Sequence, residues 1–155
     1  MKRILFVCSG NLGRSPMAAG LLEKMLRSEG MAGFAVSSAG SVAASGEEAA
    51  EEAVAVAAER GVDLTGHRSR PIDRQMLQAA DLILCMTRQH KESVVRLEPR
   101  AEEKVRLLAS LAPGSTGEEE IADPAGGGVE AFDECLTEME KPLVGLVKRI
   151  KEGTI

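Results

Sequence analysis

A cysteine and an arginine, separated by five residues, lie in the segment Val7–Pro16, which reads VCSGNLGRSP. An apolar run, Ile4–Val7, precedes the cysteine, and Ser15-Pro16 is typical of the start of a helix. A strand, a glycine-bearing loop and a helix N-terminus can together cradle an anion, because the backbone N–H groups and the helix dipole favour negative charge there. Cys8 lies at the mouth of this cradle, where the same field favours a thiolate. The segment therefore predicts a covalent phosphoenzyme rather than a simple phosphate-binding site.

Each polar residue of the loop has a candidate role in this chemistry. Cys8 is the candidate nucleophile, and Arg14 is the candidate phosphate ligand because its planar guanidinium can hold two oxygens at once. Ser15 can donate its hydroxyl to the thiolate, and Asn11 tolerates a left-handed backbone. The residues that we expect to line the phosphate site are Ser9, Gly10, Asn11, Leu12, Gly13, Arg14 and Ser15. The competing interpretation is a buried cysteine beside an ordinary turn, since this Cys–Arg spacing also arises by chance.

An acid is also required, because the leaving group must be protonated. Asp123-Pro124 lies in a long segment rich in glycine and proline, residues 112–128, and Asp123 is the candidate. The same carboxyl group could then activate water to hydrolyse the cysteinyl phosphate. On its own an Asp-Pro pair is more often a turn signal, so its weight comes from its place in the chain.

The elements that position these residues follow from the apolar pattern, in which short strand-like runs alternate with helical periods. We expect strands over 3–7, 34–38, 81–86 and 104–111. We expect helices from the N-cap Ser15 to the terminator Gly30, over 47–60, over 72–80, from the cap Thr87 to before Pro99, and over 129–151 with a bend or restart near Pro142. This alternation predicts a parallel sheet covered on both faces. The loops after the first and fourth strands then meet at one edge of the sheet, which brings Cys8, Arg14 and Asp123 to one pocket.

Composition bounds the class of protein. The 155 residues, 44% of them apolar, predict one domain over 1–155. Three widely spaced cysteines make a poor disulfide framework and fit a reducing cytoplasm. A net charge of −5 argues against nucleic-acid binding, and the apolar runs are too short for a membrane span. No CxxC pair occurs and the two histidines lie far apart, so we expect no metal site. We also expect no cofactor, and we favour a monomer.

The loop resembles that of the low-molecular-weight protein tyrosine phosphatases, which reads V-C-x-G-N-x-C-R-S-P. The likeness continues, in order, through Met17-Ala18, Ser37–Gly40, Gly66–Arg70, Ala80–Leu84 and Asp123-Pro124. It implies a three-layer, flavodoxin-like α/β fold of the phosphatase I type, whose four-stranded parallel sheet has the order 2-1-3-4. It also implies a phosphorylated protein substrate and hydrolysis of phosphotyrosine through Cys8, Arg14 and Asp123, with Ser15 assisting the thiolate. Ser38 and His67 would brace Asn11 and the loop.

Three positions depart from the family pattern. Gly13 stands where the family usually has a second cysteine, able to form a protective disulfide with the nucleophile. Ala125 stands where tyrosine-specific members usually carry an aromatic residue. The segment Asp123–Gly128 resembles the protein-arginine phosphatase branch, whereas that branch tends to have threonine where Leu12 stands. Leu12 and Ala125 are therefore the candidate specificity residues, and phosphoarginine is the alternative substrate.

Two further functions remain open at this stage. Thioredoxin-linked arsenate reductases share this fold and loop, but they need two further cysteines close together, and only Cys85 lies in that region of the sequence. A phosphate-binding module without turnover is the other alternative. The presence of Cys8, Arg14, Ser15 and Asp123 together argues against it.

Overall fold

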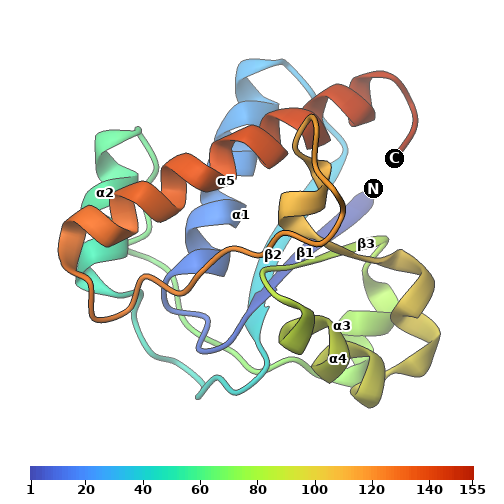
Figure 1. Cartoon of the computed structure of the whole chain (residues 1–155), viewed down its shortest axis with the longest axis horizontal. Helices are drawn as coiled ribbons and strands as arrows, with labels where there is room; N and C mark the ends of the chain where they lie inside the picture. Colours follow the sequence, from blue (N-terminus) through green and yellow to red (C-terminus); the bar gives the residue numbers. More distant parts are fainter.

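Four parallel strands form the central sheet of the computed structural model, which describes residues 1–155 (Figure 1). The strands are β1 (Lys2–Cys8), β2 (Phe34–Gly40), β3 (Leu82–Cys85) and β4 (Val105–Leu107). Their order is β2-β1-β3-β4, as predicted. Strand β1 is central, and its Val7 pairs with Ala39 on one side and with Cys85 on the other. The chain therefore leaves β1 at the point where the strand order reverses, which is where such sheets bind ligands.

Helices cover both faces of the sheet. One face carries α1 (Arg14–Ser28), α2 (Glu51–Glu59) and α5 (Gly128–Lys151); the other carries α3 (Arg74–Ala79) and α4 (Arg88–Leu97). Two short 3₁₀ segments flank β4, η1 (Pro99–Lys104) and η2 (Leu108–Leu111). None of these helices combines the length and the apolarity that crossing a membrane requires. The predicted three-layer α/β architecture is confirmed.

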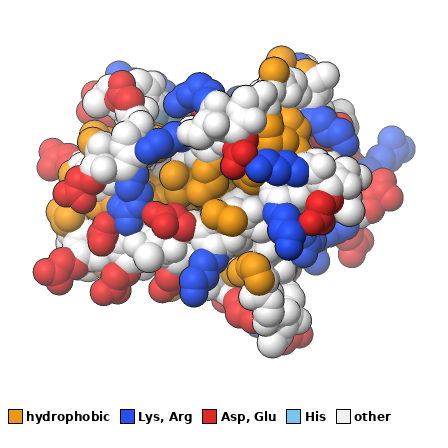
Figure 2. Space-filling view, turned by 90° about the horizontal axis from the view of Figure 1, so that it is seen from above, with side chains coloured by type: hydrophobic (Ala, Val, Ile, Leu, Met, Phe, Trp, Pro, Cys, Tyr) orange, Lys and Arg blue, Asp and Glu red, His pale blue; other side chains and the backbone are white.

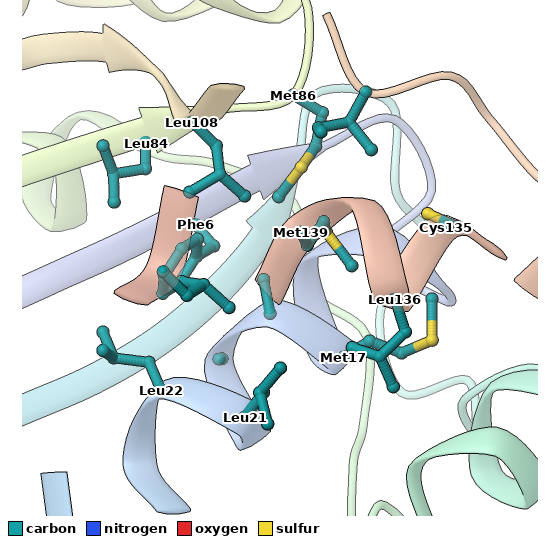
Figure 3. Close-up of a cluster of buried hydrophobic side chains, with 14 of the residues drawn as sticks. Phe6, Met17, Leu21, Leu22, Leu84, Met86, Leu108, Cys135, Leu136 and Met139 are labelled. Carbon is teal, nitrogen blue, oxygen red and sulfur yellow. The ribbon is translucent and has the colours of Figure 1, made fainter. Parts of the chain in front are cut away.

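Alternate side chains of β1 supply the two apolar cores. Ile4, Phe6 and Cys8 face the larger core, and Leu5 and Val7 face the smaller one. Figure 3 shows Phe6 between the α1 leucines and Leu84, with α5 residues beside it. Each fully buried side chain of this kind contributes about 1.5–3 kcal/mol relative to an exposed one. Packing on both faces thus fixes the end of β1, where the candidate loop begins.

Several predicted boundaries were wrong because the backbone is used for tertiary contacts. Helix α2 begins at Glu51 rather than at 47, since Glu47 exchanges hydrogen bonds with Ser69 and the Ala50 N–H donates to the Leu12 carbonyl. The predicted strand over 104–111 ends at Leu107 and turns into η2. There Gly145 of α5 lies so close that a Cβ would overlap the Leu111 carbonyl oxygen.

Two helix predictions also need correction. The N-cap of α1 is Gly13, not Ser15, so Ser15 lies inside the first turn and its hydroxyl is free for the loop. Helix α5 does not restart at Pro142: the 24-residue helix is continuous through this buried proline. Thr87 caps α4 as predicted, and Asp73 caps the shorter α3.

The surface mixes charges of both signs. Figure 2 looks at the molecule from above and shows apolar side chains in the middle of that face, with Lys, Arg, Asp and Glu around them. An apolar groove of about 430 Å³ runs between α1 and α5, over Leu21, Met25 and Val147. Two lysines that line the groove are already bonded within the protein: Lys24 donates to the Arg60 carbonyl, and Lys151 forms an ion pair with Glu29.

Candidate active site

The loop between β1 and α1 places a thiol beside a hydroxyl. Cys8 is the last residue of β1 and is 3% exposed. Its Sγ lies 2.9 Å from the Ser15 Oγ in the first turn of α1. Because the Asn11 amide donates to the same Oγ at 2.8 Å, the Ser15 proton is directed toward the sulfur or toward the Ala39 carbonyl oxygen, 3.4 Å away. A thiolate at Cys8 would receive that proton as a hydrogen bond.

Asn11 fixes the shape of the loop. It is fully buried and has a φ of 58°, a left-handed conformation that few residues other than glycine adopt. Its side chain donates to the Ser38 Oγ at 2.9 Å and accepts from the Arg70 N–H at 3.0 Å, and its carbonyl accepts from the His67 Nε2 at 2.7 Å. The structure therefore brings Ser38 and His67 to the loop, at the positions expected of braces.

The end of β2 presses against the same loop. The N–H groups of Ser41 and Val42 donate to the carbonyls of Cys8 and Ser9. A Cβ at Gly40 would overlap the Ser9 carbonyl oxygen and would lie 3.0 Å from the Asn11 nitrogen. Only glycine fits this close approach, so Gly40 helps to set the loop although sequence reasoning gave it no role.

Arg14 connects the loop to the segment that carries the candidate acid. Its guanidinium is 5% exposed and donates from Nη1 to the Ile121 carbonyl at 2.9 Å. Nη2 lies 3.4 Å from the Ser9 Oγ and 3.7 Å from the Asp123 Oδ2. The structure thus brings Asp123 close to Arg14, in the loop that also carries Cys8.

Asp123 has the exposure that a proton-transferring group needs. Its side chain is 58% exposed, and its Oδ1 accepts from the Ala125 N–H at 3.0 Å while Oδ2 faces Arg14. Ala125 itself is exposed, and Leu12 of the loop is half-buried. These two candidate specificity residues therefore both reach solvent near the site.

His90 is a site residue that sequence reasoning missed. It is 2% exposed on α4, and its Nε2 lies 2.8 Å from the Ser9 Oγ. Burial lowers the pKa of His90 to about 4, and the Arg14 charge adds to this lowering, while Glu120 and Asp123 oppose it. The only signal in the sequence was its place three residues after the cap Thr87, which marks a capping box and not a site.

The other two thiols, Cys85 and Cys135, lie in different cores. Cys85 faces the smaller core, on the opposite side of the sheet from Cys8, whereas Cys135 lies in the larger core with Cys8. Burial raises the pKa of each thiol, Cys85 and Cys135, to about 12. Because the thiolate is the reactive form, a raised pKa disfavours reaction of either thiol at neutral pH.

The fold and the sequence are those of one class of enzyme. The family model of low molecular weight phosphotyrosine protein phosphatases matches residues 3–154, and the chain belongs to this family. It is 38% identical over 149 residues to a protein-arginine-phosphatase of Geobacillus stearothermophilus, covering 96% of both chains. It is 36% identical to a probable low molecular weight protein-tyrosine-phosphatase, EpsP, of Ralstonia nicotianae, covering 97% of both.

Solved structures agree with this assignment. The YwlE arginine phosphatase from Geobacillus stearothermophilus superposes with a TM-score of 0.89 at 37% identity, covering 99% of this chain and 95% of that one. A low molecular weight protein tyrosine phosphatase from T. tengcongensis gives a TM-score of 0.87 at 33% identity, covering 96% and 99%. The chain is therefore a member of a family of cysteine-dependent hydrolases.

Proposed function

We propose that residues 1–155 act as a single-domain phosphatase that removes phosphate from proteins through a cysteinyl-phosphate intermediate on Cys8. One observation carries this proposal: the Cys8 Sγ lies 2.9 Å from the Ser15 Oγ at the N-terminus of α1. Few structural cysteines have such surroundings, because a helix N-terminus and a hydroxyl donor both stabilise a thiolate. Arg14 and Asp123 supply the cation and the acid beside it.

In the first step the Cys8 thiolate attacks the phosphorus. An S–P bond forms while the P–O bond to the substrate breaks, and Asp123 gives its proton to the departing oxygen. The loop N–H groups and Arg14 hold the three remaining phosphoryl oxygens, where negative charge develops. Arg14 has been oriented for this by the Ile121 carbonyl.

In the second step water hydrolyses the intermediate. Asp123, now ionised, takes a proton from the water as its oxygen attacks the phosphorus, and the S–P bond breaks. The sulfur leaves as a thiolate, which Ser15 stabilises by donating its hydroxyl proton. Asn11 keeps Ser15 in place through its amide, and Ser38 and His67 keep Asn11 in place.

Hydrolysis of p-nitrophenyl phosphate by variants of two residues tests this mechanism. We expect Cys8→Ser to abolish turnover and to retain binding of inorganic phosphate. We expect Asp123→Ala to lower kcat by about 10²- to 10⁴-fold, the usual contribution of a general acid, with little change in the inhibition constant for phosphate. An active Cys8→Ser variant, or an inactive wild-type protein, would refute the covalent mechanism.

Phosphotyrosine is the substrate that the loop favours. Leu12 is a half-buried apolar residue of the loop, and an apolar wall suits an aryl leaving group. The family to which the chain belongs is named for phosphotyrosine. We propose that it acts on phosphorylated proteins in the cytoplasm and as a monomer.

Phosphoarginine is the second candidate, and a specific observation favours it. The segment after Asp123 reads PAGGG, without the aromatic residue that would stack on a phosphotyrosine ring. The arginine phosphatase of Geobacillus stearothermophilus is also a relative at 38% identity. The ratio of kcat/KM on phosphotyrosine and phosphoarginine peptides, measured for the wild type and for Leu12→Thr, separates the two. A wild type that prefers phosphoarginine would overturn the phosphotyrosine assignment.

Arsenate reduction has no support from the positions of the thiols. That reaction needs two further cysteines that can exchange disulfides, and here Cys85 and Cys135 lie in different cores. Thioredoxin-dependent reduction of arsenate by the wild type would restore this alternative.

A further inference from the structure

The contact between His90 and Ser9 has a defined direction. The Thr87 N–H donates to the His90 Nδ1 at 3.1 Å, so this nitrogen carries a lone pair rather than a proton. The neutral ring therefore has its hydrogen on Nε2, which lies 2.8 Å from the Ser9 Oγ. His90 donates and Ser9 accepts.

This direction determines what the Ser9 hydroxyl can do. Its oxygen accepts from His90 and also faces the Arg14 Nη2 at 3.4 Å. With both lone pairs turned toward these donors, the hydroxyl proton is left to donate, and no acceptor in the protein takes it. Ser9 is the first residue after the nucleophile, and it is only partly buried. Its free proton therefore lies beside the place where Arg14 would hold a phosphoryl oxygen.

We propose that His90 is a positioning residue whose Nε2–H holds the Ser9 hydroxyl beside Arg14 as an additional hydrogen-bond donor to the bound phosphoryl group. The proposal rests on the proposed phosphatase reaction at Cys8. It assigns a contact with substrate to the Ser9 side chain, beyond the loop N–H groups and Arg14. A hydrogen bond to a charged group contributes more than one between neutral groups, so the loss of this donor is measurable.

His90 also has a structural role, from which the proposed one must be separated. Its Nδ1 accepts from Thr87 at the start of α4, and its own N–H donates to the Thr87 Oγ1 at 3.4 Å. A change at His90 could therefore loosen α4 and lower activity indirectly. Ser9 takes no part in this cap, which makes it the independent probe.

Three single variants distinguish the two roles. In His90→Asn the amide oxygen can replace Nδ1 at the cap, but the shorter side chain cannot reach Ser9. In His90→Gln the amide nitrogen can take the place of Nε2 and donate to Ser9. Ser9→Ala removes the hydroxyl and leaves the α4 cap intact. The double variant of Ser9→Ala with His90→Asn completes a double-mutant cycle, which measures whether the two side chains act together.

The readouts are kcat and KM for p-nitrophenyl phosphate, the inhibition constant for inorganic phosphate, and Tm. We expect Ser9→Ala and His90→Asn each to lower kcat/KM about tenfold and to weaken phosphate inhibition similarly, which corresponds to one hydrogen bond to a charged group. We expect the double variant to match Ser9→Ala alone, and His90→Gln to recover most of the activity. We expect the changes in Tm among these variants not to parallel the changes in kcat/KM.

Two results would overturn the proposal. One is a Ser9→Ala variant that keeps kcat/KM and phosphate inhibition within twofold of the wild type, a result that does not depend on how the His90 variants fold. The other is losses that multiply in the double variant, which would show that the two residues act separately. An inactive wild type would instead count against the phosphatase reaction itself.

Discussion

The buried neutral imidazole of His90 makes the stability of this protein depend on pH in a calculable way. Burial, with a smaller contribution from the nearby Arg14 charge, lowers the pKa of His90 from 6.5 to about 4, against the opposing charges of Glu120 and Asp123. As the pH falls toward and below 6.5, His90 binds a proton in the unfolded chain but stays neutral in the folded protein. The folded state therefore loses stability mostly as the pH falls from about 6.5 to about 4, and only a small part of this loss occurs above 6.5.

The magnitude follows from the two pKa values. A shift from 6.5 to about 4 corresponds to a total loss of about 3 kcal/mol, of which about 2 kcal/mol has appeared at about pH 5. We expect His90→Gln, which cannot titrate, to lack this part of the pH dependence. Urea unfolding of both proteins at about pH 8 and about pH 5 measures it, since other groups contribute nearly equally to the two proteins. Parallel loss of stability in wild type and variant would refute the buried neutral ring.

Three further variants or treatments test other parts of the site. Gly40→Ala should lower kcat/KM at least about tenfold and lower the free energy of unfolding by about 1–3 kcal/mol, because the added methyl group would overlap the loop backbone. Gly66→Ala is the control, since its Cβ would meet nothing within 4 Å, and it should change neither quantity. Enzyme assays and urea unfolding measure the two effects. Arg14→Lys should lower kcat about 10²-fold, because an ammonium group cannot make the bidentate hydrogen bonds to two phosphoryl oxygens that a guanidinium makes. A near-normal kcat in steady-state assays would contradict this. Peroxide-treated enzyme should regain little activity with dithiothreitol, because Gly13 offers no thiol to trap oxidised Cys8 before it becomes a sulfinic acid; full recovery would refute this.

Local patterns in the sequence predicted a parallel sheet and the approach of the Asp123 loop to the Cys8–Arg14 loop, whereas the strand order was implied only by the resemblance to the phosphatase family. Alternating strands and helices imply parallel strands, and the loop with its glycines marks the edge that binds ligand. The place of Asp123 in the loop after the fourth strand then followed from topology alone. These predictions needed no knowledge of side-chain contacts.

What the sequence did not predict depends on contacts between distant segments. His90 reaches Ser9 across 81 positions of the chain, and its spacing from Thr87 indicated only a helix cap. Gly40 is needed because of the loop that packs on it, which no pattern around residue 40 reveals. The start of α2 was misplaced for the same reason, since the Ala50 N–H donates to the Leu12 carbonyl of the distant loop.

The position of Ile121 divides the long loop before α5 into two parts with different freedom to change. Its side chain is 3% exposed, its N–H donates to the Met86 carbonyl at 2.9 Å, and its carbonyl accepts from Arg14. Asp123 is two residues further on, so its backbone can lie no more than about 7 Å from this fixed point. Upstream, Ser115 and Thr116 bond only to neighbours within the loop, such as Glu119. We therefore expect a peptide tag or a binding sequence inserted at 114–117 to leave Asp123 in place, which makes this turn a point of attachment on the folded protein.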